Sequence, residues 1–326
     1  MNKINDEQLR VLANLESAYD TWMQAEREIP SGRPWLAWRK VGSREYLYEL
    51  RNRSGYGQSL GPRSEETEKL HQAYLARQAE REVVVERTKS LRAANDQLAR
   101  MYRALRLPVI DEAAGDVLRE ADRRRLLGSA LLVVGTNTMA AYEIEARHRF
   151  ATGLDSTADC DLTWAGGPGA LAISGNVTAP IMDMLKYVDE LYTVNSEKPW
   201  QARNGKGYEV EILLAPSMVA HYPHEETLRP SSLPEQEWLL LGERVAHVVV
   251  DRGGTPVRIV APDPRWMALH KLWLADKPGR SALKVDKDRA QGRALLAAVR
   301  AHMPQFPLDQ TFDAGVPDAL QKYLAG

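Results

Sequence analysis

The sequence has a single cysteine, Cys160, so it can form no internal disulfide and no thiolate metal cage. It also lacks an excess of either charge, because 43 Lys and Arg residues stand against 44 Asp and Glu residues. This balance argues against binding of nucleic acid through the overall field of the protein. No apolar run approaches the roughly 20 residues of a membrane-spanning helix, and the polar N-terminus lacks the features of a signal peptide. We therefore expect a cytoplasmic protein.

What the chain does contain is the composition of a globular protein, with 44% hydrophobic and 27% charged residues. Its 326 residues suffice for one large domain or two ordinary ones. The first segment predicts an amphipathic helix over Asp6–Glu28. Alternating residues then predict a hairpin of strands 35–40 and 45–50. Residues 55–63 are rich in glycine and polar side chains and predict a loop.

A long helix is predicted over residues 64–105, with Ser64 as its N-cap and Pro108 beyond its end. Its basic residues are Arg77, Arg81, Arg87, Lys89, Arg92, Arg100, Arg103 and Arg106, and its nearby acids are Glu80, Glu82, Glu86 and Asp96. Two interpretations remain open. We prefer a solvated helix face, because the acids neutralise part of the charge. The other interpretation is a surface that contacts the phosphates of a nucleic-acid substrate.

From Gly128 onward, short apolar strands alternate with helices. Strands are predicted at residues 130–134, 157–164, 171–174, 208–214, 245–251 and 256–260, a helix at 181–192, and mostly helix from Pro264 to the end. This order predicts an α+β fold in three regions. They are an N-terminal helical region with a small β-hairpin (1–127), a mixed β-sheet core (128–262) and a C-terminal helical region (263–326).

A Gly-Thr turn follows the first strand of the core, where Gly135, Thr136 and Asn137 open a helix. Glycine allows a ligand to approach the backbone closely, and the free amides at a helix start attract phosphate. An ordinary structural turn explains the same residues.

Two pairs of acidic residues occur on later strands. Side chains alternate along a strand, so Asp159 and Asp161 share one face while Cys160 points to the other. Two carboxylates at this spacing suit Mg²⁺, and the alternative is an exposed edge strand with two solvated acids. Glu209 and Glu211 likewise share a face of a second strand. We prefer Glu211 as the third acid of a site for two metals, although the choice between the two remains open.

Other candidates carry less chemistry. His221 and His224 flank a proline and have no evident third ligand, which favours a surface loop. The segment 252–255 lacks the lysine and following helix of a phosphate-binding P-loop and is typical of a hairpin turn. Lys271 and Lys287 are candidates for triphosphate contacts, or ordinary exposed lysines.

The order of Gly135-Thr136, Asp159-Cys160-Asp161 and a later acid resembles the signature of nucleotidyltransferases with a polymerase-β-like palm. More closely, the chain resembles a bacterial family of nucleotidyltransferase-fold proteins whose physiological substrate is not established. Residues 45–63, 270–273 and 287–288 also look like that family. Threonine stands at position 136 where serine is commoner. The spacing to Asp159 is also longer than in the compact pattern, with an inserted segment at 147–149.

The resemblance implies that Gly135 and Thr136 contact the triphosphate, that Asp159 and Asp161 bind two Mg²⁺ ions, and that Glu211 is the third acid. Residues 128–262 are then the palm. The implied reaction transfers a nucleoside monophosphate from a nucleoside triphosphate such as ATP to an acceptor and releases pyrophosphate. RNA, a protein and a small molecule remain open as acceptors, and an RNA-modifying toxin is one form of this hypothesis. The alternative is a catalytically inactive protein of this fold that binds nucleic acid or regulates.

Overall fold

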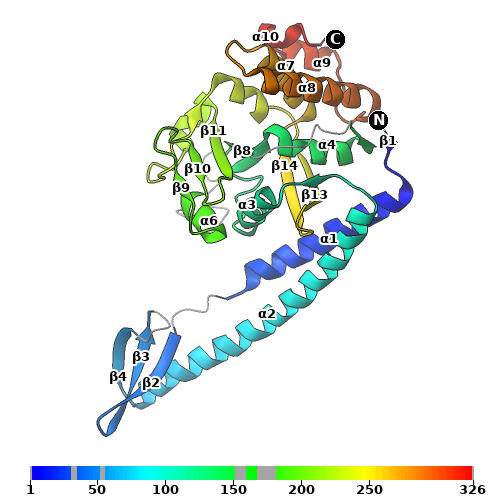
Figure 1. Cartoon of the computed structure of the whole chain (residues 1–326). Coiled ribbons are helices and arrows are strands. Elements are labelled where there is room, and N and C mark those ends of the chain that lie inside the picture. Colours follow the sequence, from blue (N-terminus) through cyan, green and yellow to red (C-terminus); the bar gives the residue numbers. More distant parts are fainter. Residues whose placement is uncertain (1, 31–34, 52–55, 151–158, 167–180, 325–326) are drawn as a thin grey trace. The chain divides into compact units, whose positions relative to one another are not determined.

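The computed structural model of the chain describes residues 2–30, 35–51, 56–150, 159–166 and 181–324. Contacts divide the chain into two compact units, one of residues 20–94 and one of residues 1–19 with 95–326. Mixed β-sheets and flanking helices make up the fold, so the predicted α+β class is confirmed (Figure 1). None of the described helices is long and apolar enough to cross a membrane. The three regions expected from the sequence stay a prediction, and the strand predicted at residues 171–174 lies outside the described residues.

The smaller unit is a three-stranded antiparallel sheet with parts of two long helices. Its elements are β2 (Trp35–Val41), β3 (Arg44–Leu50) and β4 (Gly57–Pro62), with α1 (Asp6–Glu28) and α2 (Glu65–Ala104) each continuing into the larger unit. The loop predicted over residues 55–63 is wrong, because most of it is β4, paired with β3. Position 57 of this strand has room only for glycine, because a Cβ atom there would overlap the backbone carbonyl of Glu49. The predicted N-cap is present, since Thr67 N donates to Ser64 Oγ at 3.3 Å.

The larger unit is built on a mixed sheet in the order β6-β8-β11-β10-β9, with β12 beside β11. The strands are β6 (Leu131–Val134), β8 (Asp159–Trp164), β9 (Thr193–Val194), β10 (Gln201–Arg203), β11 (Glu209–Leu214) and β12 (Ser231–Ser232). β6 is antiparallel to β8, and β8 is parallel to β11. Every residue of β6 is apolar and buried, as expected for a strand covered on both faces.

A second sheet and several short helices surround this one. The second sheet has the order β14-β13-β5, from β5 (Val109–Ile110), β13 (Val245–Asp251) and β14 (Pro256–Ala261), and β1 (Asn2–Lys3) pairs with β7 (His148–Arg149). The helices are α3 (Glu112–Arg123), α4 (Met139–Glu145) and α6 (Ile181–Val188), and 3₁₀ turns lie at Gly135–Thr138, Pro216–His221 and Pro234–Leu240. The Asp111 side chain caps α3 by accepting from Ala113 N at 2.9 Å.

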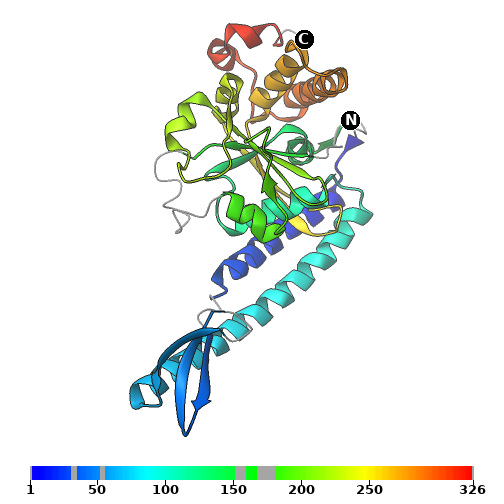
Figure 2. The same cartoon turned by 60° about the vertical axis from the view of Figure 1, so that its left-hand side comes forward.

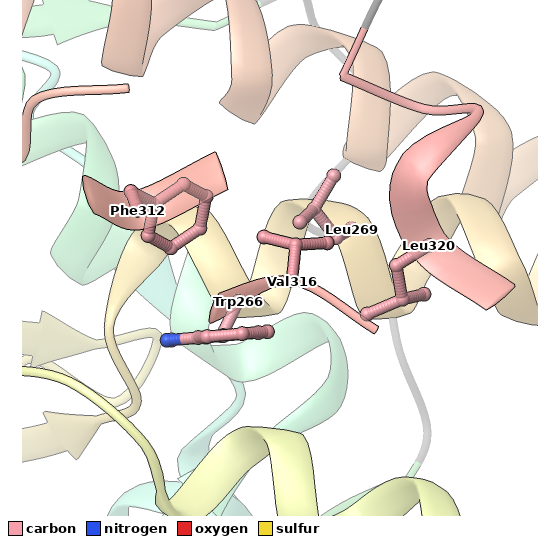
Figure 3. Close-up of a cluster of buried hydrophobic side chains, with 5 residues drawn as sticks. All are labelled: Trp266, Leu269, Phe312, Val316 and Leu320. Atoms are coloured by element: carbon pink, nitrogen blue, oxygen red, sulfur yellow. The ribbon is translucent and has the colours of Figure 1, made fainter. Parts of the chain in front are cut away.

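The helices that follow the sheets gather at one end of the larger unit (Figure 2). They are α7 (Pro264–Asp276), α8 (Ala282–His302), α9 (Gln310–Gly315) and α10 (Asp318–Gln321). The buried cluster of Trp266, Leu269, Phe312, Val316 and Leu320 fixes α7 against the two last helices (Figure 3). This apolar contact holds one side of α7, and other residues of the same helix reach the site described next.

Candidate active site

Three neighbouring strands bring the candidate acids together. Asp161 on β8 is in register with Glu211 on the parallel strand β11. On its other side Asp161 is in register with Val134, the last residue of β6. Gly135 follows directly, so the Gly-Thr turn begins beside Asp161. The alternation predicted along β8 is present, since Cys160 is fully buried while Asp159 and Asp161 are partly exposed.

The Gly-Thr turn is tied to the acid strand by its own side chains. Gly135 has a φ of +73°, a left-handed conformation that glycine adopts easily. Asn137 Nδ2 donates to the backbone carbonyl of Asp159 at 3.0 Å, and Thr138 Oγ1 donates to that of Gly135 at 2.7 Å. Thr136 Oγ1 accepts from Gln291 Nε2 of α8 at 3.3 Å. Thr136 and Asn137 are buried and brace the turn from within.

One pocket of about 330 Å³ opens at this point, between the sheet and the C-terminal helices. Four residues singled out from the sequence line it: Gly135, Asp161, Glu211 and Lys271. Among the described residues, its other charged or polar lining comes from Glu235, Gln236, His270, Lys277, Arg280 and Lys284. Carboxylates and cations therefore meet in one cavity. Thr136, Asn137, Asp159 and Lys287 are not among the described residues that line it.

The pKa of the Asp161 carboxyl differs strongly from its ordinary value. Its pKa is raised to about 7, mainly by burial and also by the nearby carboxylates of Asp159 and Glu211, while Lys271 and Lys284 act in the opposite direction. Three acids thus lie close enough to repel one another, and a cation placed among them would relieve that repulsion.

Glu209 and Glu211 are joined by a residue that sequence reasoning missed. Gln201 on β10 is buried, and its Nε2 donates to Glu209 Oε2 at 3.0 Å and to Glu211 Oε1 at 2.8 Å. Gln201 lies opposite Glu211 in the antiparallel register. Only Glu211 of the two acids lines the pocket in the described part of the chain. No sequence signal marks Gln201, because its role depends on strand pairing.

The lysine in the pocket wall is held by a buried carboxylate. Lys271 Nζ on α7 lies 2.9 Å from Asp288 Oδ1 on α8, and both side chains are almost fully buried. Arg280 approaches the other oxygen of Asp288 at 2.5 Å. Burial alone would raise the pKa of Asp288, but Lys271 and Arg280 lower it overall. The pair fixes the Lys271 ammonium next to the acids.

Lys287 is half-buried on α8. Burial lowers its pKa, Lys271 lowers it further, and Asp159, Asp288 and Asp161 oppose these effects. Lys287 therefore lies within electrostatic reach of both aspartates of β8, although it lies outside the pocket lining.

Other residues considered from the sequence do not join this site. Burial raises the pKa of the Cys160 thiol, as expected of a core cysteine rather than a nucleophile. His221 and His224 lie in and after a 3₁₀ turn, and His224 is exposed. Residues 252–255 connect the paired strands β13 and β14, so the hairpin-turn prediction is confirmed.

The acidic side chains near the pocket are the candidate ligands for Mg²⁺. Within the described ranges, no group of three or more His, Cys, Asp or Glu side chains is arranged to hold a metal ion. Mg²⁺ in phosphoryl-transfer sites is commonly bound by one or two carboxylates, with water and substrate phosphates completing the shell. Asp159 and Asp161 supply that number of carboxylates, and Asp161 lines the pocket together with Glu211. The residues present therefore fit such an ion.

The comparisons with known proteins give one match. A protein-family model described as nucleotidyltransferase matches residues 112–316, which is more than half of the chain. The matched range contains the whole site, from the Gly-Thr turn to Asp288. No curated protein and no solved structure matches the chain.

Proposed function

Since the chain belongs to a nucleotidyltransferase family, we propose that it transfers a nucleoside monophosphate from a nucleoside triphosphate to an acceptor and releases pyrophosphate. The observation that carries this proposal is the common pocket of Gly135, Asp161, Glu211 and Lys271. A phosphate-binding turn, metal-binding carboxylates and a fixed cation are the parts that phosphoryl transfer requires. The same order of motifs supports assignment to the polymerase-β-like superfamily.

In the proposed reaction, an acceptor oxygen forms a bond to the α-phosphorus while the bond from that phosphorus to the bridging oxygen breaks. The acceptor's proton leaves to solvent, and the electron pair of the broken bond stays on pyrophosphate. Mg²⁺, when bound, neutralises charge on the transferring group and lowers the pKa of the attacking oxygen. Asp159 and Asp161 would hold that ion, with Glu211 beside them.

The remaining residues have supporting tasks. The open backbone at Gly135 admits phosphate oxygens close to the start of the turn. Lys271, held by Asp288, offers a fixed positive charge to the β- and γ-phosphates, so the triphosphate is positioned before reaction. Lys287 adds positive potential near Asp159. The acceptor is RNA, a protein or a small molecule, and the test below identifies its class.

The test incubates the protein with each α-labelled nucleoside triphosphate, Mg²⁺ and fractionated cell extract, and then locates the labelled fraction. Asp159→Asn and Asp161→Asn should each abolish labelling, because a neutral amide cannot provide the charge that the ion requires. Asp183→Asn, an exposed acid on α6, is the matched control and should label normally. Retained labelling in either strand variant, with an unchanged melting temperature, would refute the assignment of the metal ligands.

A further inference from the structure

Two buried side chains in the pocket wall have polar atoms without a hydrogen-bond partner among the described residues. His270 on α7 is 5% exposed, and Gln236, in the turn at Pro234–Leu240, is 2% exposed. Both ring nitrogens of His270 and the Oε1 of Gln236 have no partner within the described part of the chain. Both residues line the same pocket as Gly135 and Asp161. Buried polar groups are nearly always hydrogen-bonded in proteins, so two such side chains in one wall require an explanation.

His270 and Gln236 both present polar groups without a net charge. The pKa of His270 is lowered to about 3, mainly by burial and also by the charge of Lys271. The imidazole is therefore uncharged at neutral pH and carries one N–H donor and one nitrogen acceptor. The amide of Gln236 likewise offers a carbonyl oxygen and an NH₂ group. Such groups suit a flat ligand with mixed donors and acceptors, whereas phosphate requires donors alone.

The residues around His270 and Gln236 also favour an uncharged, ring-shaped ligand. Leu213, Leu233 and Leu274 give the pocket apolar lining. Two of the neighbouring cations are held by carboxylates, since Lys277 Nζ lies 2.5 Å from Glu235 Oε1 and Arg280 pairs with Asp288. Apolar walls with a few fixed polar groups are typical of subsites for rings rather than for charged groups.

We propose that Gln236 and His270 form the recognition site for the adenine base of the nucleoside triphosphate. The exocyclic amino group of adenine has two hydrogens, one for Gln236 Oε1 and one for the unprotonated nitrogen of His270. A glutamine amide pairs well with adenine, whereas guanine is usually recognised by Arg or Lys, and Lys271, Lys277 and Arg280 already have carboxylate partners. The purine ring presents more apolar surface to the leucines than cytosine does. This inference rests on the proposed function, because it assumes that the triphosphate occupies the same pocket.

The test measures equilibrium binding of ATP, GTP, CTP, UTP and inorganic triphosphate without acceptor. Wild-type protein should bind ATP at least about tenfold more tightly than the other three nucleotides. Gln236→Leu and His270→Phe should each remove most of that preference and leave the affinity for inorganic triphosphate unchanged. Neither should lower the melting temperature of the ligand-free protein, because each removes an unpaired buried polar group. Gln305→Leu, at an exposed position outside the pocket lining, is the control and should keep the preference.

The outcomes separate the inference from the proposed function. Equal binding of all four nucleotides by the wild type would overturn the adenine site and leave the proposed function standing. If the variants lost as much affinity for inorganic triphosphate as for ATP, the two side chains would have only a structural role. That result would also overturn the adenine site. Failure of the wild type to bind any nucleotide or triphosphate would overturn both.

Discussion

Gly135 and Asp161 lie so close that no side chain fits between them. A Cβ atom built on Gly135 would overlap Oδ2 of Asp161 and lie 3.3 Å from the Asp161 Cβ. Val134 pairs with Asp161 across the two strands, so the contact follows from strand register. The glycine that opens the Gly-Thr turn, which we propose to bind phosphate, is thus also the residue that leaves room for the Asp161 carboxylate.

We predict that Gly135→Ala lowers transfer activity about one-hundredfold, because a displaced catalytic carboxylate costs roughly that factor. Gly128→Ala is the matched control. Gly128 precedes the same strand, has a similar φ of +81° and would bring its Cβ only to ordinary contact at 3.5 Å from the side chain of Val260. Both substitutions should cost about 1–2 kcal/mol of unfolding free energy through backbone strain, measured by denaturant titration. Equal activities in the two variants would contradict the role given to the Gly135–Asp161 contact.

The third acid is assigned by a pair of substitutions. Glu211→Gln should lower the rate of transfer about one-hundredfold, which corresponds to roughly 2.7 kcal/mol of transition-state stabilisation, because Glu211 lines the pocket. Glu209→Gln should change it little, although Gln201 donates to both acids. Steady-state rates at saturating nucleotide measure the difference. A larger loss in the Glu209 variant would reverse the assignment.

Local patterns in the sequence predict much of the fold and several elements of the pocket. Strand alternation places Asp159 and Asp161 on one face, and the apolar run before Gly135 predicts a buried strand, because both signals depend only on neighbouring residues. The third strand of the small sheet was missed, since glycine and serine in β4 carry no strand signal. Its formation depends on pairing with β3 rather than on propensity.

The parts of the site that the sequence does not predict depend on long-range contacts. Gln201 reaches Glu211 because two strands are antiparallel, and Lys271 meets Asp288 because α7 and α8 pack together. Gln236 lies in an irregular turn that no periodicity marks. Such partners depend on tertiary packing, so a single sequence does not predict them.

The buried imidazole of His270 should make stability depend on pH. Its folded pKa of about 3 lies below the unfolded value of 6.5, so the unfolded chain binds more protons between these values. The contribution of His270 to the unfolding free energy should therefore fall by about 1.4 kcal/mol for each pH unit below 6.5 and vanish above it, while Asp161, whose pKa is raised to about 7 in the folded chain, contributes a slope of opposite sign. His270→Phe should remove only the His270 contribution, so the slope of unfolding free energy against pH should be lower by about 1.4 kcal/mol per pH unit than in the wild type, in denaturant titrations from pH 6.5 to pH 5. His224→Phe, at an exposed position, should keep the wild-type slope, and the same slope in both variants would contradict the prediction.

Lys271 on α7 and Asp288 on α8 form a buried ion pair. Removing one member of a buried ion pair leaves an uncompensated charge and typically costs about 3–5 kcal/mol. Asp288→Asn should be the more damaging change, because it deprives both Lys271 and Arg280 of their partner. The double variant with Lys271→Met should be less destabilised than the sum of the single effects, by about 0.5–3 kcal/mol. Denaturant unfolding of the four proteins measures this coupling, and additive effects would mean that the two side chains do not stabilise each other.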